Sequence, residues 1–371
     1  MSEQVNIYEH FKTIPDPRIL RGKKHLLEDI IFLAIVSIIC GADDWNEIEV
    51  FAKLKIEWFR KYSHLSNGIP SHDTFNRVFS LLDPKKFTEL AMELFNKNIL
   101  DGLDLISIDG KTVRRSLDKR NNKFPIHIVS AWSSRNRISL GQIKVEEKSN
   151  EITAIPELLS LINVKNSVVS IDAMGCQKKI TEKIIEQNGD YAICLKGNQP
   201  AIHNEVSKYF EKQILSEFEG VNFAYSMKEE MSHGRIEKRE YWLLTNIDWI
   251  SRKEEWKGLK SVGMVRSERE YQGKKSIESR YFISSLTDLD IFQKSVRTHW
   301  QIENSCHWIL DVVFREDDSR IRAGNAAENF SVLRKIGLNF LKNETTFKIG
   351  VKGKRRAAGW DDEYRNKIIG I

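Results

Sequence analysis

The sequence lacks the features of secreted, disulfide-bonded or membrane-spanning proteins. Its four cysteines, Cys40, Cys176, Cys194 and Cys306, are widely spaced and form no Cys-x2-Cys pair, so we expect reduced core thiols. The N-terminus is polar and has no signal-peptide core. The most apolar run, Ile30 to Cys40, is too short to span a bilayer. These absences favour a cytoplasmic protein with no membrane partner.

The sequence also has no strong charge excess, no internal repeat and no low-complexity segment. Hydrophobic residues make up 41% and charged residues 30% of the chain, as in ordinary globular proteins. The net charge of +6 and the pI near 8.9 are a mild bias that is compatible with a polyanionic partner. With 371 residues, the chain is longer than a usual single domain, so we expect two domains.

Two short apolar runs each end in an aspartate that a glycine soon follows. They are Leu105-Ile106-Ser107-Ile108-Asp109-Gly110 and Val168-Val169-Ser170-Ile171-Asp172-Ala173-Met174-Gly175. Such runs are typical of buried strands. The segment between them is long enough for a crossover, so the strands are expected to be parallel neighbours about 4.8 Å apart. Asp109 and Asp172 would then lie at the same sheet edge.

Two carboxylates at one sheet edge would repel each other. Such a pair either raises one pKa or binds a cation, and oxygen ligands favour Mg²⁺ or Mn²⁺. Aspartate is also a common turn residue, so each one alone is equally consistent with a simple strand end. A third carboxylate is needed to decide between these interpretations.

Helices are predicted for the first 100 residues. The expected helices run from Leu26 to Cys40 and from Trp45 to Tyr62, and two more begin after Ser71 and at Pro84. A basic lead-in over residues 11–25 is either a phosphate-contacting arm or a solvated segment. This helical module could place a helix in a DNA groove, but a packing role would explain it equally well.

From about residue 103 the pattern changes to alternating strands and helices. The pattern predicts a mixed sheet flanked by helices, with strands over 103–109, 126–133, 138–145, 168–172 and 191–196 and helices over 155–162 and 177–188. Residues 218–286 are rich in strand-forming residues and are predicted to be a β-rich insertion. The basic tail from 346 to 371 is expected to be poorly ordered.

The third carboxylate, Glu303, is placed on a helix predicted from Asp288 to about Phe314. The expected apolar stripe of this helix is Val296, Trp300, Glu303, His307, Leu310 and Phe314. A buried, unpaired glutamate would cost several kcal/mol, so Glu303 needs a partner, either an arginine such as Arg297 or a metal. Together with the two aspartates, the metal is the favoured interpretation.

Other ligand sets stay open. His299, Glu303 and His307 recur at i, i+4 and i+8, which suggests zinc, but three ligands along one helix span too much length for a tetrahedral ion. The third carboxylate of the set could instead come from the acidic residues that follow, Asp311, Glu316, Asp317 and Asp318.

A set of short motifs covers nearly the whole chain. The N-terminal motifs are Asp16-Pro17-Arg18, Cys40-Gly41-Ala42 and Gly68-Ile69-Pro70-Ser71-His72-Asp73-Thr74-Phe75. The later motifs are Ile108-Asp109-Gly110-Lys111, Val129-Ser130-Ala131-Trp132, Asp172-Ala173-Met174-Gly175-Cys176-Gln177, Lys196-Gly197-Asn198-Gln199 and His299-Trp300-Gln301-Ile302-Glu303-Asn304. With these motifs, the sequence resembles the DDE transposases of bacterial insertion sequences, specifically the H-repeat-associated transposase family.

The resemblance implies an α/β fold of RNase H-like type. Its mixed sheet would be flanked by helices, with the β-rich insertion at about 218–286. The implied domains are an all-helical transposase-associated domain over 1–100, a catalytic domain over 101–345 and a basic C-terminal tail over 346–371. The implied catalytic triad is Asp109, Asp172 and Glu303, which would hold two Mg²⁺ (or Mn²⁺) ions.

The implied activity is metal-dependent DNA cleavage and strand transfer at the ends of an insertion sequence. The implied partners are double-stranded DNA, as terminal inverted repeats and target, and a second copy of the chain in a homodimer. The implied location is the bacterial cytoplasm, at the nucleoid when DNA is bound. An in-line attack on a phosphate needs no protein nucleophile, which agrees with the absence of a nucleophile motif.

In one respect the sequence departs from related enzymes. Many of them carry Tyr-x2-Arg-x3-Glu-x6-Lys around the glutamate, whereas this chain has Val296, His299 and Leu310 at those positions. The side chains that contact DNA phosphates are therefore chosen by their charge and position alone. These candidates, each equally explained as an ordinary surface charge, are Lys111, Arg114, Arg115, Lys196, Arg297 and His299.

Two other functions are open at the level of the sequence. One is an RNase H-like nuclease without strand transfer, and the other is a catalytically silent remnant that only binds DNA. Selective cleavage at terminal inverted repeats would argue against the plain nuclease. Activity that survives Asp109→Ala and Asp172→Ala would indicate a binding protein.

Overall fold

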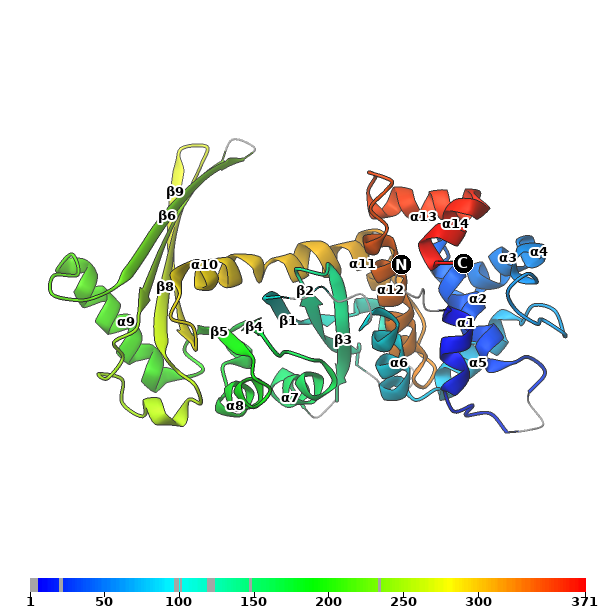
Figure 1. The fold of residues 1–371 in the computed structure, drawn as a ribbon, viewed down its shortest axis with the longest axis horizontal. Coiled ribbons are helices and arrows are strands. Elements are labelled where there is room, and N and C mark those ends of the chain that lie inside the picture. Colours follow the sequence, from blue (N-terminus) through cyan, green and yellow to red (C-terminus); the bar gives the residue numbers. More distant parts are fainter. Residues whose placement is uncertain are drawn as a thin grey trace. The chain divides into compact units, whose positions relative to one another are not determined.

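The computed structural model describes residues 6–19, 23–96, 100, 102–118, 124–146, 149–232 and 235–371 (Figure 1). Residues 20–22 of the predicted basic lead-in, and residues 233–234 of the predicted β-rich insertion, lie outside this set. The chain forms two compact units. The first comprises residues 1–101, 110–148 and 301–371, and the second comprises 102–109 and 149–300. The chain therefore passes between the units directly after Asp109 and directly after Trp300.

Helices build the N-terminal part of the first unit, as predicted. They are α1 (Ile7–His10), α2 (Leu27–Ile39), α3 (Trp45–Leu54), α4 (Ile56–Phe59), α5 (His72–Leu81) and α6 (Pro84–Asn96). All residues of α2 except Glu28 are buried, which explains its unbroken apolar run. The single helix predicted over 45–62 is instead interrupted at Lys55. Ser71 caps α5 as expected, with its Oγ 3.4 Å from the Thr74 amide nitrogen.

The rest of the first unit adds a β-hairpin and a second set of helices. The hairpin pairs β2 (His127–Ser133) and β3 (Ile138–Val145) in antiparallel orientation. The helices are α11 (Trp308–Val312), α12 (Ala326–Asn343), α13 (Val351–Trp360) and α14 (Asp362–Ile369). Helix α12 packs against α2, α5, α6 and β3, so it lies at the centre of this unit.

The C-terminal tail is helical, so the prediction of a poorly ordered tail is wrong. Lys354 and Arg355 of α13 are only 8% and 4% exposed. The Arg355 guanidinium donates to the carbonyl oxygens of Ile38 and Ala42 at 2.9 and 3.0 Å and pairs with Asp43 at 2.9 Å. Ile38 lies in the last turn of α2 and Ala42 lies just beyond it, so the buried arginine provides donors to carbonyl oxygens at the C-terminal end of this helix. The sequence shows the positive charges but not the acceptors that bind them.

The second unit is built on a mixed sheet, which confirms the α/β prediction. Strand β1 (Asp104–Thr112) contributes its residues up to Asp109 to this unit. The strands run in the order β1, β4 (Ser167–Ile171), β5 (Asp190–Leu195), β9 (Lys274–Ser284), β8 (Ser261–Tyr271), β7 (Arg235–Leu244) and β6 (Ala224–Ser232). Strands β1, β4 and β5 are parallel, and the remaining pairs are antiparallel. The predicted β-rich segment therefore extends this sheet.

Helices α7 (Glu151–Leu161), α8 (Lys178–Glu186), α9 (Pro200–Leu215) and α10 (Leu289–Thr298) complete the second unit (Figure 1). Helix α8 packs against β5, α9 against β9, and α10 against β4, β5 and β7. Phe292 of α10 is fully buried in a core with Leu243, Val265 and Phe282 of the sheet. This core fixes the helix that ends just before His299.

Candidate functional site

The two predicted aspartates follow neighbouring parallel strands at the same sheet edge, as expected. Strand β1 pairs with β4 from Asp104↔Ser167 to Ile108↔Ile171, and Asp109 and Asp172 are the next residue of each strand. Both are partly exposed. The register therefore places two carboxylates side by side where the paired strands end, within the second unit.

A short turn orients the Asp172 carboxylate. Its Oδ1 accepts hydrogen bonds from the backbone amides of Met174 and Gly175 at 3.0 and 3.4 Å, which starts a 3₁₀ turn over Ala173–Gly175. A Cβ at Gly175 would lie well inside van der Waals contact of the Ile171 side chain, so this turn requires glycine. The hydrogen bonds hold one carboxylate oxygen in place.

A second turn, after β5, supports the first. Asn198 Nδ2 donates to the Ala173 carbonyl at 2.6 Å, and Gln199 Nε2 donates to the Cys176 carbonyl at 2.8 Å. The exposed Lys196 begins this turn, so its ammonium belongs to the same edge of the sheet as Asp172. Lys196 was the one residue of the Lys196-Gly197-Asn198-Gln199 motif with a predicted role, so the supporting amides were missed.

His299 is held against the strand that carries Asp172. Its Nδ1 lies 3.2 Å from Ser170 Oγ, and Ser170 Oγ in turn lies 3.4 Å from Ser107 Oγ on β1. Burial lowers the pKa of His299, although Asp172 acts in the opposite direction. His299 is therefore a neutral group that joins the end of α10 to the sheet, rather than a cation for phosphate.

Arg297, the arginine suggested as a partner of Glu303, pairs within the second unit. Its guanidinium lies 3.2 Å from the Glu230 carboxylate of β6. Both side chains are about half exposed, at 47% each. Such a pair contributes little to stability and leaves the guanidinium accessible to water.

Glu303 is exposed, so the prediction that it lies on a buried helix face is wrong. It starts a π-helical turn over Glu303–His307 in the first unit. His307 and Leu310 of the predicted stripe are buried as expected, and the other buried residues of this stretch are Ile302, Cys306 and Ile309. A π turn holds extra residues, so it rotates the side chains that follow relative to a regular α-helix. Such turns are frequent at functional sites, and the stripe derived from α-helical spacing did not allow for one.

His307 closes the same π turn. A ligand atom of His307 lies within 4.8 Å of a Glu303 carboxylate oxygen. Burial, together with the nearby Lys335, lowers the pKa of His307 to about 3. The imidazole is therefore neutral at physiological pH, which is the form that binds metals.

Three of the four acidic residues that were alternative third ligands surround Lys111. Its ammonium pairs with Asp311, and it lies 2.9 Å from Glu316 and 3.6 Å from Asp317. Burial alone would lower the pKa of Lys111, but Glu316 and Asp311 raise it to about 12. Within the first unit, these carboxylates therefore act as counter-ions of a buried lysine.

Arg114 and Arg115 lie beside this cluster with exposed side chains. Arg114 is 3.3 Å from Asp317, and Arg115 is 3.4 Å from Asp318. Their side chains are 82% and 56% exposed, so both guanidiniums are accessible to a ligand.

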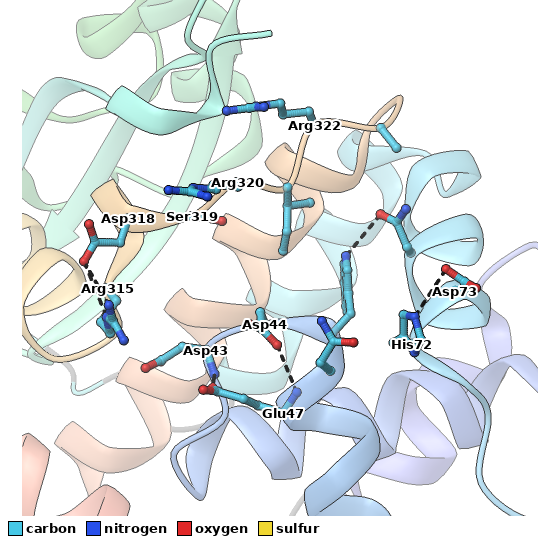
Figure 2. Close-up of a pocket in the computed structure, with 15 residues that line it drawn as sticks. Asp43, Asp44, Glu47, His72, Asp73, Arg315, Asp318, Ser319, Arg320 and Arg322 are labelled. Atoms are coloured by element: carbon cyan, nitrogen blue, oxygen red, sulfur yellow. Dashed lines mark hydrogen bonds and ion pairs between the residues drawn. The ribbon is translucent and has the colours of Figure 1, made fainter.

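A groove of about 520 Å³ in the first unit contains charges of both signs (Figure 2). Arg320 and Arg322 come from the 315–323 segment, and Asp43, Asp44 and Glu47 lie across the groove at the start of α3. Asp44 caps α3 by accepting from the Glu47 amide at 2.9 Å. Because the two walls have opposite charge, the groove selects neither an anion nor a cation by charge alone. The sequence analysis did not single out these arginines.

Comparison with known proteins gives the class and then the family. Residues 8–94 match the model described as "DDE_Tnp_1-associated", and residues 101–340 match "Transposase DDE domain". The chain is 43% identical to "Putative transposase YncI" of Escherichia coli O157:H7 over 98% of this chain and 94% of that protein. It is 41% identical to "H repeat-associated putative transposase YhhI" of Escherichia coli (strain K12), over 99% and 98%.

These matches define the class as bacterial transposase. The chain belongs to the DDE transposase family, alongside the H repeat-associated proteins, which confirms the resemblance inferred from its motifs. Among solved structures, "Cryo-EM structure of piggyBac transposase synaptic complex with hairpin DNA (SNHP)" matches with a TM-score of 0.41 at 10% identity, over 98% of this chain and 77% of that one. That likeness is too small to support an argument. Among the described residues, no helix is long and apolar enough to cross a membrane.

Proposed function

We propose that this transposase cuts DNA at the ends of an insertion sequence and joins those ends to a target, using an RNase H-like catalytic domain. The proposed metal ligands are Asp109, Asp172 and Glu303, with Mg²⁺ or Mn²⁺ as the ion. The observation that carries the proposal is the β1–β4 register, in which the last pair, Ile108↔Ile171, is followed on each strand by an aspartate.

The residues fit a hard divalent cation by their chemistry. Three carboxylates supply oxygen ligands only, which suits Mg²⁺ and Mn²⁺ better than zinc. The amides of Met174 and Gly175 hold one oxygen of Asp172 in place, so part of the ligand set is pre-oriented. When bound, a pair of divalent ions activates the attacking water or 3′-hydroxyl and stabilises the leaving oxygen.

The chain itself limits how far Glu303 can lie from the aspartates. His299 contacts Ser170, which is two residues before Asp172. Glu303 follows His299 by four residues, which span roughly 14 Å even when fully extended. Its exposure leaves the carboxylate accessible for such a role. His307, which is neutral and next to Glu303, is a further group that could orient this carboxylate.

The basic side chains differ in how well they suit DNA phosphates. Lys196, Arg114 and Arg115 are exposed and are proposed to contact the DNA backbone. Lys111, whose ammonium pairs with acidic residues, and His299, which contacts Ser170 of the sheet, are not proposed to contact DNA directly. The proposed partners are duplex DNA and a second copy of the chain, and the proposed location is the bacterial cytoplasm, at the nucleoid when DNA is bound.

The test is cleavage of a labelled duplex that carries the element's own ends, with Mg²⁺ and with a chelator. Asp109→Asn, Asp172→Asn and Glu303→Gln should each abolish cleavage while still binding the ends. Glu57→Gln serves as the matched control, because Glu57 is 78% exposed, pairs with Arg60 and is not a candidate ligand, and this variant should still cleave. Equal cleavage by wild type and Glu303→Gln would move the third ligand elsewhere. A wild type that binds the ends without cutting them would indicate a silent remnant.

A further inference from the structure

A second groove in the first unit gathers exposed apolar side chains. It measures about 540 Å³ and is formed by α11, the end of α12, the 344–350 segment and the start of α13. Trp308, Val312, Phe347 and Ile349 line it and are 57%, 50%, 46% and 38% exposed. Large apolar side chains gathered at one place on a surface mark a binding site more often than isolated ones do.

The same groove is lined by an excess of positive charge. The lining cations are Arg137, Lys342, Lys348, Lys352 and Lys354, and Glu344 is the one carboxylate among the described lining residues. Glu344 is already occupied, because it accepts from the Thr346 amide at 2.7 Å and the Tyr364 hydroxyl at 2.9 Å. Its nearest cation in the groove is Lys354, at 3.5 Å.

Arg137 and Lys354 lie close enough to Lys342 to repel its ammonium. Burial lowers the pKa of Lys342, and the neighbouring Arg137 and Lys354 lower it further. Among the described residues, no carboxylate pairs with Lys348 or Lys352, and both side chains are exposed. An anionic group in the groove would relieve this repulsion.

We propose that this groove binds an unpaired nucleotide of a DNA single strand, with the base against Trp308 and phosphates on Lys348 and Lys352. Aromatic faces combined with a cationic rim are the usual means of binding single-stranded nucleic acid. A paired base is stacked and offers its edges only, so the indole selects an unpaired one. The volume lies within the roughly 300–1,000 Å³ of sites that hold small organic groups.

The position of the groove gives this binding a role in the proposed reaction. Trp308 begins α11 directly after the π turn that starts at Glu303. A nucleotide held there would belong to DNA close to the proposed cutting site, at a stage when its strand is unpaired. The inference rests on the proposed function only in taking DNA as the ligand. It requires neither the metal nor the triad.

The test is binding of a labelled DNA single strand by the full chain, measured by fluorescence anisotropy without a divalent ion. Trp308→Ala should weaken binding by about 5- to 150-fold, because stacking on one aromatic ring is worth about 1–3 kcal/mol. Trp308→Phe should restore most of the affinity. Trp360→Ala is the matched control, because Trp360 is 78% exposed on α13 but does not line the groove, and it should bind as wild type.

The phosphate contacts have their own readout. Lys348→Ala combined with Lys352→Ala should reduce the slope of log affinity against log salt by about 1.4, since each contact to a single strand contributes about 0.7. Lys61→Ala combined with Lys86→Ala removes two exposed lysines elsewhere in the same unit and should leave the slope unchanged. An abasic nucleotide in the strand should reduce wild-type affinity but not that of Trp308→Ala.

Several outcomes would overturn the inference. One is wild-type affinity for the DNA strand in a folded Trp308→Ala variant, and another is an equal loss of affinity in Trp360→Ala. A third is that an acidic peptide binds the groove in a Trp308-dependent way and single-stranded DNA does not. The last would assign the groove to a protein segment. Failure of the proposed function is separate, because a wild type that does not cut its ends would still show the Trp308-dependent binding.

Discussion

The buried lysine Lys111 gives the sharpest test of how charge is arranged in this chain. Its side chain is 14% exposed, and that of its partner Glu316 is 2% exposed. Burial alone would raise the pKa of Glu316, but Lys111, Lys335 and Arg334 lower it to about 2. We therefore expect Lys111 to be a structural group, although the sequence made it a candidate for contacting DNA.

The expected effect of Lys111→Met is a loss of about 3 kcal/mol in the free energy of unfolding. Removing one member of a buried ion pair typically costs about 3–5 kcal/mol, because the partner is left charged and poorly solvated. The lower end applies here, since Ser331 Oγ still donates to Glu316 at 2.9 Å and Lys335 stays close by. Adding Glu316→Gln to Lys111→Met removes the orphaned charge and should recover part of the loss.

The assay is urea unfolding of the variants, followed by circular dichroism. Arg114→Ala is the control, because its side chain is 82% exposed and makes a single surface pair, so it should change stability by at most about 0.5 kcal/mol. The reasoning would be refuted if Lys111→Met were as stable as wild type but bound the transposon ends more weakly. That result would support the prediction from sequence that Lys111 contacts phosphate.

Two further predictions concern single residues in different units. Burial raises the pKa of Glu328 from 4.5 to about 7; Lys144 opposes this shift and Glu146 adds to it. Between these pH values Glu328 is protonated in the folded state and ionised in the unfolded state, so the free energy of unfolding falls as the pH rises. Glu328→Gln should therefore be more stable than wild type at pH 8, by up to about 3 kcal/mol, and little different at pH 4; equal differences in melting temperature at both pH values would contradict this. In the second unit, a Cβ at Gly263 would lie 2.8 Å from Phe292 Cε1, so Gly263→Ala should lose about 1–3 kcal/mol in urea unfolding, whereas Gly197→Ala, with open space around it, should not.

The elements that could be predicted from sequence are those with strong local signals. The paired strand segments that lead to Asp109 and Asp172 carry apolar runs and turn residues, and their pairing follows from the crossover between them. The helix cap of Asp288 is equally local, with its Oδ1 2.9 Å from the Ile291 amide nitrogen. In each case neighbouring residues determine the structure, so no long-range information is needed.

The elements that were missed depend on distant partners. Helix α12 has buried polar residues such as Asn329, Arg334 and Lys335, so its sequence shows no simple apolar stripe. Asn329 Nδ2 donates to the carbonyls of Phe79 and Leu82 at 2.8 and 2.9 Å, which lie far away in the sequence. The π turn at Glu303 was missed for a related reason, because a regular helical period was assumed across it.

Partners within the fold also determine which basic side chains are available to contact DNA. The sequence has a net charge of only +6, so most of its basic groups must be balanced by acids within the chain. Arg355 is committed to backbone carbonyls and Asp43, and Lys111 to three carboxylates. Lys348 and Lys352 instead face a groove whose one described carboxylate is occupied. Proximity in sequence to a catalytic motif is thus a poor guide to DNA contact, and exposure of the charged group, which Lys111 lacks and Lys348 and Lys352 have, is a better one.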